Sequence, residues 1–337
     1  MISWRFWRSQ HEFNAHKAHK RAWAFAVVAV LAAALALAGL RLAGPVSAAA
    51  GSPPGGSAST LPPAPKAPAT SDGSRLRVMT FNIRHGEGLD GRVNLARIAA
   101  VIEGRRPDVV FVQEVDRHLI RTGFKDEAAW LAQRLGMNYT FGPNLRLFPG
   151  DYGTLILTRL PITTWQNYAL PGAGEPRGLL TATLDLGDGR VIEVGGTHLG
   201  LSEGARHSQL TAIMEHLAPE GRSAGPSILG GDFNTSSASE FTSIPGWTAT
   251  WQDAFGAAGQ GPAATFGAAG GGHGERIDYI WASTGLAVLD SQVVKTDASD
   301  HWAVVADLAL DLAHYPGTPA SADVTTTADI AAADAAR

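Results

Sequence analysis

A carboxylate and a carboxamide stand two residues apart at the end of an apolar run, in the stretch Ile228-Leu229-Gly230-Gly231-Asp232-Phe233-Asn234. Residues i and i+2 of a strand lie on one face, so we expect Asp232 and Asn234 to point into one pocket. Phe233 is then expected to pack on the opposite side. The two glycines allow another backbone or a bound group to come close. Alone the pattern is weak, because Gly-Gly-Asp is also common in turns.

Further polar side chains stand where an apolar run meets a loop, which is where α/β folds place their sites. The set is Asn82, Glu114, His198, Asp232, Asn234, Asp278, Asp300 and His301. Any one of them alone is more simply a turn former, a surface charge or a satisfied histidine. As a set without thiolates, their oxygens favour Mg²⁺ or Mn²⁺. Histidines beside acidic partners suit proton transfer, so the set predicts phosphoester hydrolysis by an activated water.

Two other motifs offer rival chemistry. Gly-x-Gly-x-x-Gly at 86–91 has the spacing of a dinucleotide loop, but the next helix is expected to start only at Asn94, which favours a flexible loop. Gly-x-Ser-x-Gly at 200–204 matches the turn that carries a serine nucleophile. A serine hydrolase would use Ser202 with one Asp and one His, and would leave most of the polar set unexplained.

Composition limits the chemistry and the partners. The 337 residues are 45% hydrophobic and contain no cysteine, which excludes disulfides, thiolate zinc sites and cysteine nucleophiles. The first 48 residues hold six basic side chains against Glu12 alone, a net charge of +5, which leaves −9 on the rest of a chain whose total is −4. An acidic body binds polyanions poorly in a non-specific way, although a locally basic cleft stays compatible with it.

The amino-terminal region carries a membrane-directed signal. Ala22 to Leu40 is an uncharged, almost wholly apolar run that follows most of the basic cluster. Val46-Ser47-Ala48 is a small-residue cleavage pattern, which favours a removed signal peptide. The length of the run favours a retained anchor, which we prefer slightly. In both cases the charge asymmetry places the body outside the cytoplasm, either membrane-anchored or secreted.

The chain is expected to divide into four regions. These are a basic and hydrophobic signal or anchor segment at 1–43, a Pro/Ala/Gly/Ser linker at 44–74, a catalytic domain at 75–314 and a disordered tail at 315–337. In the domain, strand patterns at 76–83, 109–112, 153–158, 191–198, 228–234, 277–281 and 302–308 are separated by helix patterns at 95–102, 127–135 and 205–217. This alternation predicts an α/β domain with buried sheets.

The domain resembles the endonuclease/exonuclease/phosphatase superfamily, which includes deoxyribonucleases, apurinic endonucleases, neutral sphingomyelinases and inositol polyphosphate phosphatases. Seven segments match in family order: Met79-Thr80-Phe81-Asn82, Asp108 to Glu114, Tyr152 to Pro161, Thr197-His198-Leu199, Gly231-Asp232-Phe233-Asn234, Arg276 to Ile280, and Ser299-Asp300-His301. The resemblance covers nearly all of the domain and none of the amino-terminal segment or the tail.

The resemblance implies a four-layer α/β sandwich, in which two mixed β-sheets pack face to face with helices outside. It also implies a metal site for Mg²⁺ (or Mn²⁺). Glu114 would be the main ligand, with Asn82 and Asp300 nearby.

The same resemblance assigns the remaining residues to catalysis. Asp232 would orient or deprotonate the attacking water, and Asn234 would hold a phosphate oxygen. His301 would face the scissile phosphate, oriented through its other nitrogen by Asp278, and His198 would be a second donor to the phosphate. A carboxylate behind an imidazole fixes the tautomer of the ring and favours its charged form, which supports the pairing independently.

The chain departs from the family pattern at Thr154, where many relatives carry Asn, and at Trp302, where Arg-Pro often follows Asp-His. Thr154 is expected to weaken or redirect one pocket contact, and Trp302 to affect packing. Thr-His-Leu at 197–199 is more similar to the branches other than apurinic endonucleases, so duplex repair is the least favoured activity.

Two classes of function follow: a metal-dependent phosphoester hydrolase outside the cytoplasm, and a catalytically silent binding relative. All eight polar residues are present, which favours the enzyme. The acidic body favours a small phosphodiester or a lipid head group as substrate, with an exported or membrane-anchored nuclease as the alternative. The expected partners are that substrate and, through the amino-terminal segment, the membrane; no protein partner is predicted.

Overall fold

The computed structural model describes residues 75–187, 189–217, 225–267 and 274–310. The apolar run at 22–40, the linker at 44–74 and the tail at 315–337 therefore lie outside the described residues. Among the helices that are described, none is both long enough and apolar enough to cross a membrane.

Seven strands form the first sheet. Their order is β10 (Gly259–Gln260), β12 (Leu286–Val294), β13 (Ala303–Leu310), β1 (Arg75–Asn82), β2 (Val109–Arg117), β4 (Gly150–Thr158) and β3 (Asn138–Leu147). The sheet is mixed, because β1 runs parallel to β2 and antiparallel to β13.

Six strands form the second sheet. Their order is β5 (Ile162–Leu170), β6 (Arg177–Gly187), β7 (Arg190–His198), β8 (Ser227–Asp232), β11 (Asp278–Ser283) and β9 (Trp251–Asp253). This sheet is also mixed, because β7 and β8 are parallel whereas β8 and β11 are antiparallel.

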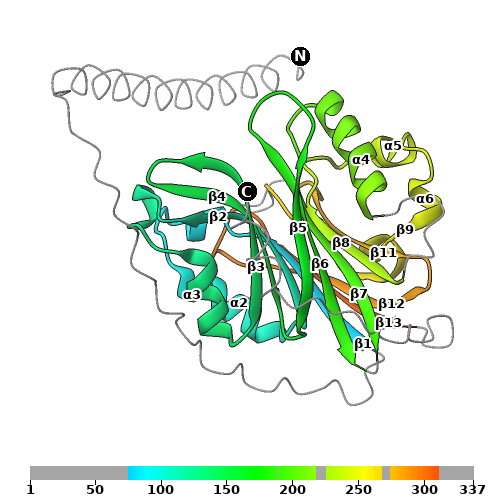
Figure 1. The fold of residues 1–337 in the computed structure, drawn as a ribbon, viewed down its shortest axis with the longest axis horizontal. Helices are drawn as coiled ribbons and strands as arrows, with labels where there is room; N and C mark the ends of the chain where they lie inside the picture. Colours follow the sequence, from blue (N-terminus) through cyan, green and yellow to red (C-terminus); the bar gives the residue numbers. More distant parts are fainter. Residues whose placement is uncertain (1–74, 188, 218–224, 268–273, 311–337) are drawn as a thin grey trace, which may run out of the picture. The chain divides into compact units, whose positions relative to one another are not determined.

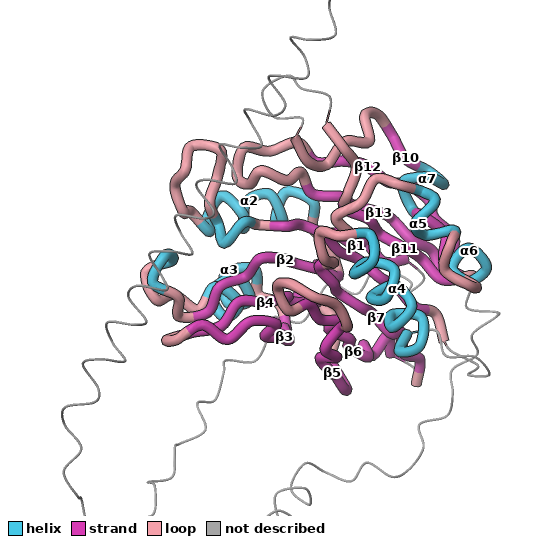
Figure 2. The backbone as a smooth tube through the Cα atoms, turned by 90° about the horizontal axis from the view of Figure 1, so that it is seen from above, coloured by secondary structure: helices cyan, strands magenta, loops and turns pink. Residues whose placement is uncertain are grey.

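The two sheets pack face to face through an apolar core, to which Phe111 and Ile156 contribute from the first sheet and Leu180 and Ile228 from the second. Two helices cover the outer face of the first sheet, α2 (Leu95–Arg105) and α3 (Glu127–Leu135), and Figures 1 and 2 show them away from the second sheet. The outer face of the second sheet is covered by α4 (Glu203–Leu217), α5 (Ala238–Thr242) and α6 (Trp247–Thr250), and the short α7 (Ala254–Ala258) follows β9. The predicted four-layer α/β sandwich is confirmed.

Local sequence signals place the helices where they are expected. Asn94 caps α2 by accepting a hydrogen bond from the amide of Ala96, and the predicted stripe of Leu95, Ile98, Ala99 and Ile102 is buried. Asp126 caps α3 through the amide of Ala129, and Gly136 ends that helix in the left-handed conformation that glycine adopts without strain.

The strand that carries Glu114 differs from the prediction. The apolar run was expected to stop at Gln113-Glu114, but β2 continues to Arg117 through a bulge between Val112 and Val115. Glu114 lies in this bulge with φ +60°. A bulge adds one unpaired residue and turns its side chain away from the regular alternation. The irregular backbone at Glu114 therefore sets the direction of its carboxylate.

The strand that carries Asp232 needs its two glycines. A Cβ on Gly230 would lie 2.1 Å from the Phe111 ring of the facing sheet, and a Cβ on Gly231 would lie 2.2 Å from the carbonyl oxygen of Thr197. The expected strand through Asn234 is too long: β8 ends at Asp232, and Asn234 adopts φ +52°. Phe233 packs away from the pocket as expected, in an aromatic cluster with Phe241, Trp247, Tyr279 and Trp281.

Candidate active site

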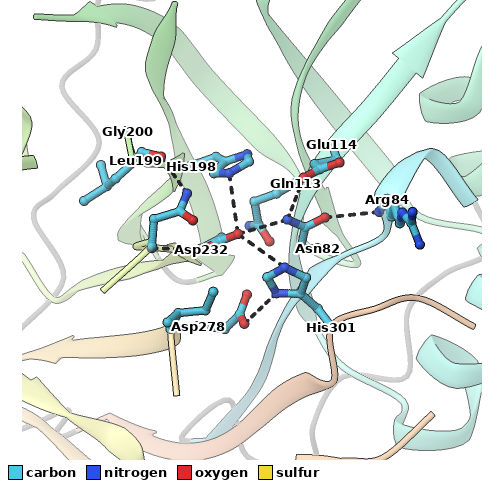
Figure 3. A network of polar contacts seen from close by, with 12 residues as sticks. Asn82, Arg84, Gln113, Glu114, His198, Leu199, Gly200, Asp232, Asp278 and His301 are labelled. Atoms are coloured by element: carbon cyan, nitrogen blue, oxygen red, sulfur yellow. Dashed lines mark hydrogen bonds and ion pairs between the residues drawn. The ribbon is translucent and has the colours of Figure 1, made fainter. Parts of the chain in front are cut away.

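Polar side chains from both sheets meet where the sheets face each other. His198 at the end of β7 pairs in register with Asp232 at the end of β8, and Asp232 pairs with Asp278 at the start of β11. From the first sheet, Asn82 ends β1, Glu114 projects from the bulge in β2, and His301 lies two residues before the start of β13. Figure 3 shows these six side chains converging from both sheets. The structure thus brings together residues that are far apart in the sequence.

Asn82 connects two carboxylates. Its Nδ2 donates to Oε1 of Glu114 at 3.1 Å and to Oδ2 of Asp232 at 3.0 Å, while its Oδ1 accepts from the amide of Arg84 at 3.1 Å. The predicted metal-site residue Asn82 therefore links Glu114 to Asp232 and faces the backbone with its own oxygen (Figure 3).

The Asp232 side chain is buried, and both of its carboxylate oxygens accept hydrogen bonds. Its Oδ1 accepts from the amide of Asn234 at 2.9 Å, and its Oδ2 accepts from Asn82. Burial raises the pKa of Asp232 to about 7, and the nearby Asp278 carboxylate contributes to the same shift. A carboxylate with a pKa near neutral pH is suited to accept a proton from water.

His301 forms a dyad with Asp278. Its Nδ1 lies 2.9 Å from Oδ2 of Asp278, and its Nε2 lies 3.7 Å from Oδ2 of Asp232. Burial opposes the charged ring, but the carboxylates of Asp278 and Asp232 more than offset it and raise the pKa of His301 to about 10. The ring of Phe266 packs against His301 with centroids 4.7 Å apart. The two carboxylates thus favour the charged form of His301, whose Nε2 faces Asp232.

His198 has the opposite character. Its Nε2 lies 3.5 Å from Oδ2 of Asp232, and Figure 3 shows the ring above that carboxylate. Burial lowers the pKa of His198 well below its usual value, and the positive charges of Arg177 and His301 add to this effect. A charged and a neutral imidazole thus flank one carboxylate.

Glu114 and Asp300 supply the oxygen donors that a hard cation prefers. Burial raises the pKa of Glu114, and the charge of Asp300 contributes, so the two carboxylates lie close enough to repel each other. Asp300 is one-third exposed and lies 3.6 Å from Nε of Arg84. Two carboxylates in a partly buried pocket without a thiolate fit Mg²⁺ or Mn²⁺.

Among the described residues, Asp232, Asp278 and His301 form a group whose ligand atoms lie within 4.8 Å of one another. Its members are already engaged, because His301 is held by Asp278 and Asp232 is held by Asn82 and Asn234. Glu114 and Asp300 are held less tightly, because Glu114 has one hydrogen bond from Asn82 and Asp300 is one-third exposed, so we prefer them as the cation site.

Asn234 and the two departures from the family pattern each make contacts outside the central network. The side-chain amide of Asn234 donates to the carbonyl oxygen of Leu199 at 2.8 Å. The Asn234 side chain is therefore not aligned with that of Asp232, as a regular strand would have required. Thr154 is buried and its Oγ1 accepts from Asn144 on β3 at 3.4 Å. Trp302 packs under Nζ of Lys295, which agrees with the expected packing role.

Several supporting residues were not singled out from the sequence. Oγ of Ser299 donates to the carbonyl oxygen of Asn82 at 2.8 Å, across 217 positions of the chain. Oγ1 of Thr265 accepts from the amide of Asp278 at 3.2 Å. Tyr152 is buried, and its pKa is raised by burial and by the charge of Glu114. The Ser-Asp-His and Tyr-Gly motifs contained two of these residues, but no local pattern marks Thr265.

The rival motifs have structural roles. Oγ of the exposed Ser202 accepts from the amide of Ala205 at 3.3 Å, so Ser202 caps the start of α4. The glycines at 86–91 do not open a helix, because α2 begins at Leu95 after the Asn94 cap. Neither motif has the local geometry that its rival chemistry needs.

A buried acid next to the pocket predicts a pH-dependent stability. Oε2 of Glu127 accepts from the amide of Asp116 at 2.9 Å, and burial raises the pKa of Glu127 to about 8. Glu127 ionises near pH 4.5 in the unfolded state but only near pH 8 in the folded state. Its protonated form therefore stabilises the fold fully below pH 4.5, and this contribution to the free energy of unfolding is lost as pH rises towards 8. The loss is about 1.4 kcal/mol per pH unit in that window. Urea melts of wild type and Glu127→Gln from pH 5 to pH 8 should diverge accordingly, whereas parallel curves would contradict a protonated Glu127.

Comparisons with known proteins give a family match, a curated relative and similar solved structures. A family model described as Endonuclease/Exonuclease/phosphatase family matches residues 79–301. YbhP from Escherichia coli is 29% identical over 172 residues, which are 47% of this chain and 66% of YbhP. A solved endonuclease/exonuclease/phosphatase from Beutenbergia cavernae is 28% identical with a TM-score of 0.57, over 70% of this chain and 72% of that one. A second solved structure, from Bacteroides vulgatus, is 21% identical with a TM-score of 0.59. The match covers 71% of this chain and 100% of that one, and it shows the shared fold.

Proposed function

The chain belongs to the endonuclease/exonuclease/phosphatase family, a family of phosphoester hydrolases, and we propose that it is a divalent-metal-dependent phosphodiesterase that acts outside the cytoplasm. One observation carries the proposal: the buried Asp232 carboxylate is flanked by the His301–Asp278 dyad and by His198, with the Glu114 carboxylate linked to it through Asn82. The site thus combines a proton acceptor (Asp232), a cationic hydrogen-bond donor (His301) and an oxygen ligand for a metal (Glu114).

The residues of the chain divide the work of hydrolysis. Oδ2 of Asp232 orients the attacking water and takes its proton, because its pKa of about 7 matches this task near neutral pH. The water oxygen bonds to phosphorus while the bond from phosphorus to the leaving alcohol breaks, and the departing alkoxide takes a proton from solvent. Nε2–H of the charged His301 donates to a phosphate oxygen, where negative charge builds up.

Three further residues complete the pocket. Asp278 holds the His301 ring through Nδ1 and keeps it charged. His198 adds a neutral donor, and the side-chain amide of Asn234, which donates one N–H to Leu199, would hold a phosphate oxygen with its other N–H. A divalent cation held by Glu114 and Asp300 would neutralise charge on the phosphate and the leaving group.

Charge and the amino-terminal sequence guide the choice of substrate and location. The domain at 75–314 has a net charge of −7, which disfavours the grip on many phosphates that a long nucleic acid requires. The apolar run at 22–40 supports export, with the segment kept as an anchor or removed. We therefore favour a small phosphodiester or a lipid head group over a polynucleotide.

A nuclease is the second candidate function, because a single cleft can be basic on an acidic domain. Arg84 lies 3.6 Å from Asp300 in the pocket, and the charge of Arg177 acts on His198. A nuclease that grips the backbone would show a log–log salt slope of about −0.9 for each phosphate contact. A catalytically silent relative is a third reading, and the completeness of the polar set argues against it.

The test is a substrate panel with the full-length protein in Mg²⁺. The panel contains bis-p-nitrophenyl phosphate, a DNA oligonucleotide, sphingomyelin vesicles and inositol phosphates, each with and without EDTA and at several NaCl concentrations. We expect hydrolysis of a small or lipid phosphodiester that EDTA abolishes and salt changes little.

The Ser202→Ala variant is the matched control and should keep full activity. Activity that persists in excess EDTA and disappears in this variant would indicate a serine hydrolase instead. A kcat/KM for DNA far above that for the small substrate, with a steep salt dependence, would make the protein a nuclease. Inactivity on every substrate would favour the silent relative.

A further inference from the structure

Four large apolar side chains project into solvent from two loops. In the loop after β2, which contains the short helix η2 (Ile120–Thr122), Ile120 is 70% exposed and Phe124 is 57% exposed. At the tip of the β3–β4 hairpin, Leu147 is 42% exposed and Phe148 is fully exposed. We call these four side chains the apolar corner. Exposed apolar side chains that gather in one place mark sites of interaction.

The two loops are neighbours. Arg117 at the end of β2 pairs in register with Asp151 at the start of β4, and at Gly150 a Cβ would lie 1.9 Å from the carbonyl oxygen of Arg117. Figure 2 shows the hairpin tip and the loop after β2 at the same end of the first sheet, next to α3. The four exposed side chains thus lie on two neighbouring loops.

The apolar corner lies beside the candidate active site. Strand β2 carries both Glu114 and Arg117, and a strand advances about 10 Å in three residues. The guanidinium of Arg121 lies 5.6 Å from the ring centroid of Tyr152, whose pKa is affected by Glu114. A surface that touches the apolar corner would therefore lie close to the phosphoester site.

The two loops of the apolar corner also carry basic groups, which are more exposed than the acidic partners of Arg117 and Arg121. The side chain of Arg121 is 47% exposed, whereas its partner Asp116 is completely buried. Arg117 is more exposed than its partner Asp126, and Lys125 and Arg146 are exposed as well. The outward-facing charge here is positive, although the domain as a whole carries −7.

We propose that the apolar corner and its basic groups dock on an anionic lipid bilayer. Apolar side chains on protruding loops insert at the level of the head groups, while Arg and Lys keep their charged ends among the phosphates. The apolar run at 22–40 would be the second membrane signal that stable attachment requires, because a single weak signal gives marginal binding.

Docking would present the active site to phosphates at the membrane surface. The favoured substrate is then a phosphodiester in a lipid head group. This part of the inference rests on the proposed function, whereas the docking itself can be measured without any hydrolysis.

The absence of cysteine from the chain permits a clean test. Full-length Phe148→Cys is labelled with an environment-sensitive fluorophore and reconstituted in vesicles of equal parts phosphatidylcholine and phosphatidylglycerol. We expect blue-shifted emission that brominated lipids quench. The matched control is Trp165→Cys on the edge strand β5, a position that is 55% exposed and lies outside the apolar corner. A fluorophore at this position should keep the emission of an aqueous environment.

The outcomes separate docking from its alternatives. An equal response at both positions would show mere proximity through the amino-terminal segment, and no response at Phe148→Cys or at Ile120→Cys would also overturn the proposal. A response that depends on protein concentration without lipid would indicate self-association instead.

Activity assays then test the substrate. The double variant Ile120→Ser/Phe148→Ser should turn over a vesicle-borne phosphodiester about tenfold more slowly, or worse. The reason is that removing two large apolar side chains from the membrane weakens binding by at least this factor. Its rate on soluble bis-p-nitrophenyl phosphate should equal that of wild type. Equal losses on both substrates would contradict a docking role, and a wild-type protein inactive on both would refute the proposed function while leaving the label result intact.

Discussion

Replacing His301 by alanine is expected to lower kcat/KM by ~10²–10⁴-fold, the usual cost of removing a group that assists proton transfer or stabilises charge at the reacting centre. Asp278→Asn should cost nearly as much. Nδ1 of His301 depends on Oδ2 of Asp278 at 2.9 Å, and the pKa of His301 is raised by this carboxylate against the effect of burial. Without the Asp278 carboxylate the ring loses its orienting partner and the largest of the interactions that favour its charged form.

The double variant decides whether the two residues act as a unit. If they do, His301→Ala/Asp278→Asn should be about as slow as either single variant, because the second substitution removes nothing that still works. Steady-state kinetics of the three variants and wild type on bis-p-nitrophenyl phosphate give the answer. The matched control is His207→Ala on the exposed face of α4, which should keep the wild-type rate. Losses that multiply would show that Asp278 and His301 act independently.

The sequence predicted the membership of the site better than its internal connections. Asn82, His198, Asp232 and Asp278 each end or begin a strand, and such ends are visible as the border between an apolar run and a polar residue. Because the functional end of the domain is formed by such borders, listing them was enough to find residues that converge in space.

The irregular backbone could not be predicted in the same way. A strand pattern assumes strict alternation, but Glu114 lies in a bulge that exists only in the pairing of β2 with β4. Asn234 leaves the strand pattern for the opposite reason, because its amide N–H is bound by the carboxylate of Asp232 and its φ is +52°. Both positions cost backbone energy that the surrounding structure must offset, and periodicity contains no information about that balance.

Long-range support was also invisible. Ser299 holds the carbonyl oxygen of Asn82 across 217 positions, and Phe266 packs on His301 from a loop with no strand or helix signal. Such contacts depend on the order of strands in the sheets, in which β13 lies between β12 and β1. Sequence pattern predicts that strands exist, but their order is a property of the whole fold.

Replacing Glu114 by glutamine is expected to weaken Mg²⁺ or Mn²⁺ binding by at least about 10- to 100-fold, the loss that follows even when only a supporting residue of a metal site is removed. Glu114 is the carboxylate in the bulge, its pKa is raised by burial, and Asp300 is close enough to add to that shift. A carboxylate in such surroundings gains most from a cation. Titration calorimetry of the full-length protein measures this affinity without any substrate.

Thermal unfolding should then show opposite effects in the two metal states. In EDTA, Glu114→Gln removes a buried charge near another carboxylate, so the variant should unfold at the same temperature as wild type or higher. In Mg²⁺ at about 100 times its dissociation constant, the wild type should gain about 2.7 kcal/mol that the variant lacks, so the order reverses. Glu215→Gln, an exposed position on α4, should follow wild type in both conditions. If Mg²⁺ shifts wild type and Glu114→Gln equally, the cation binds elsewhere, and the Asp232, Asp278 and His301 group becomes the next site to test.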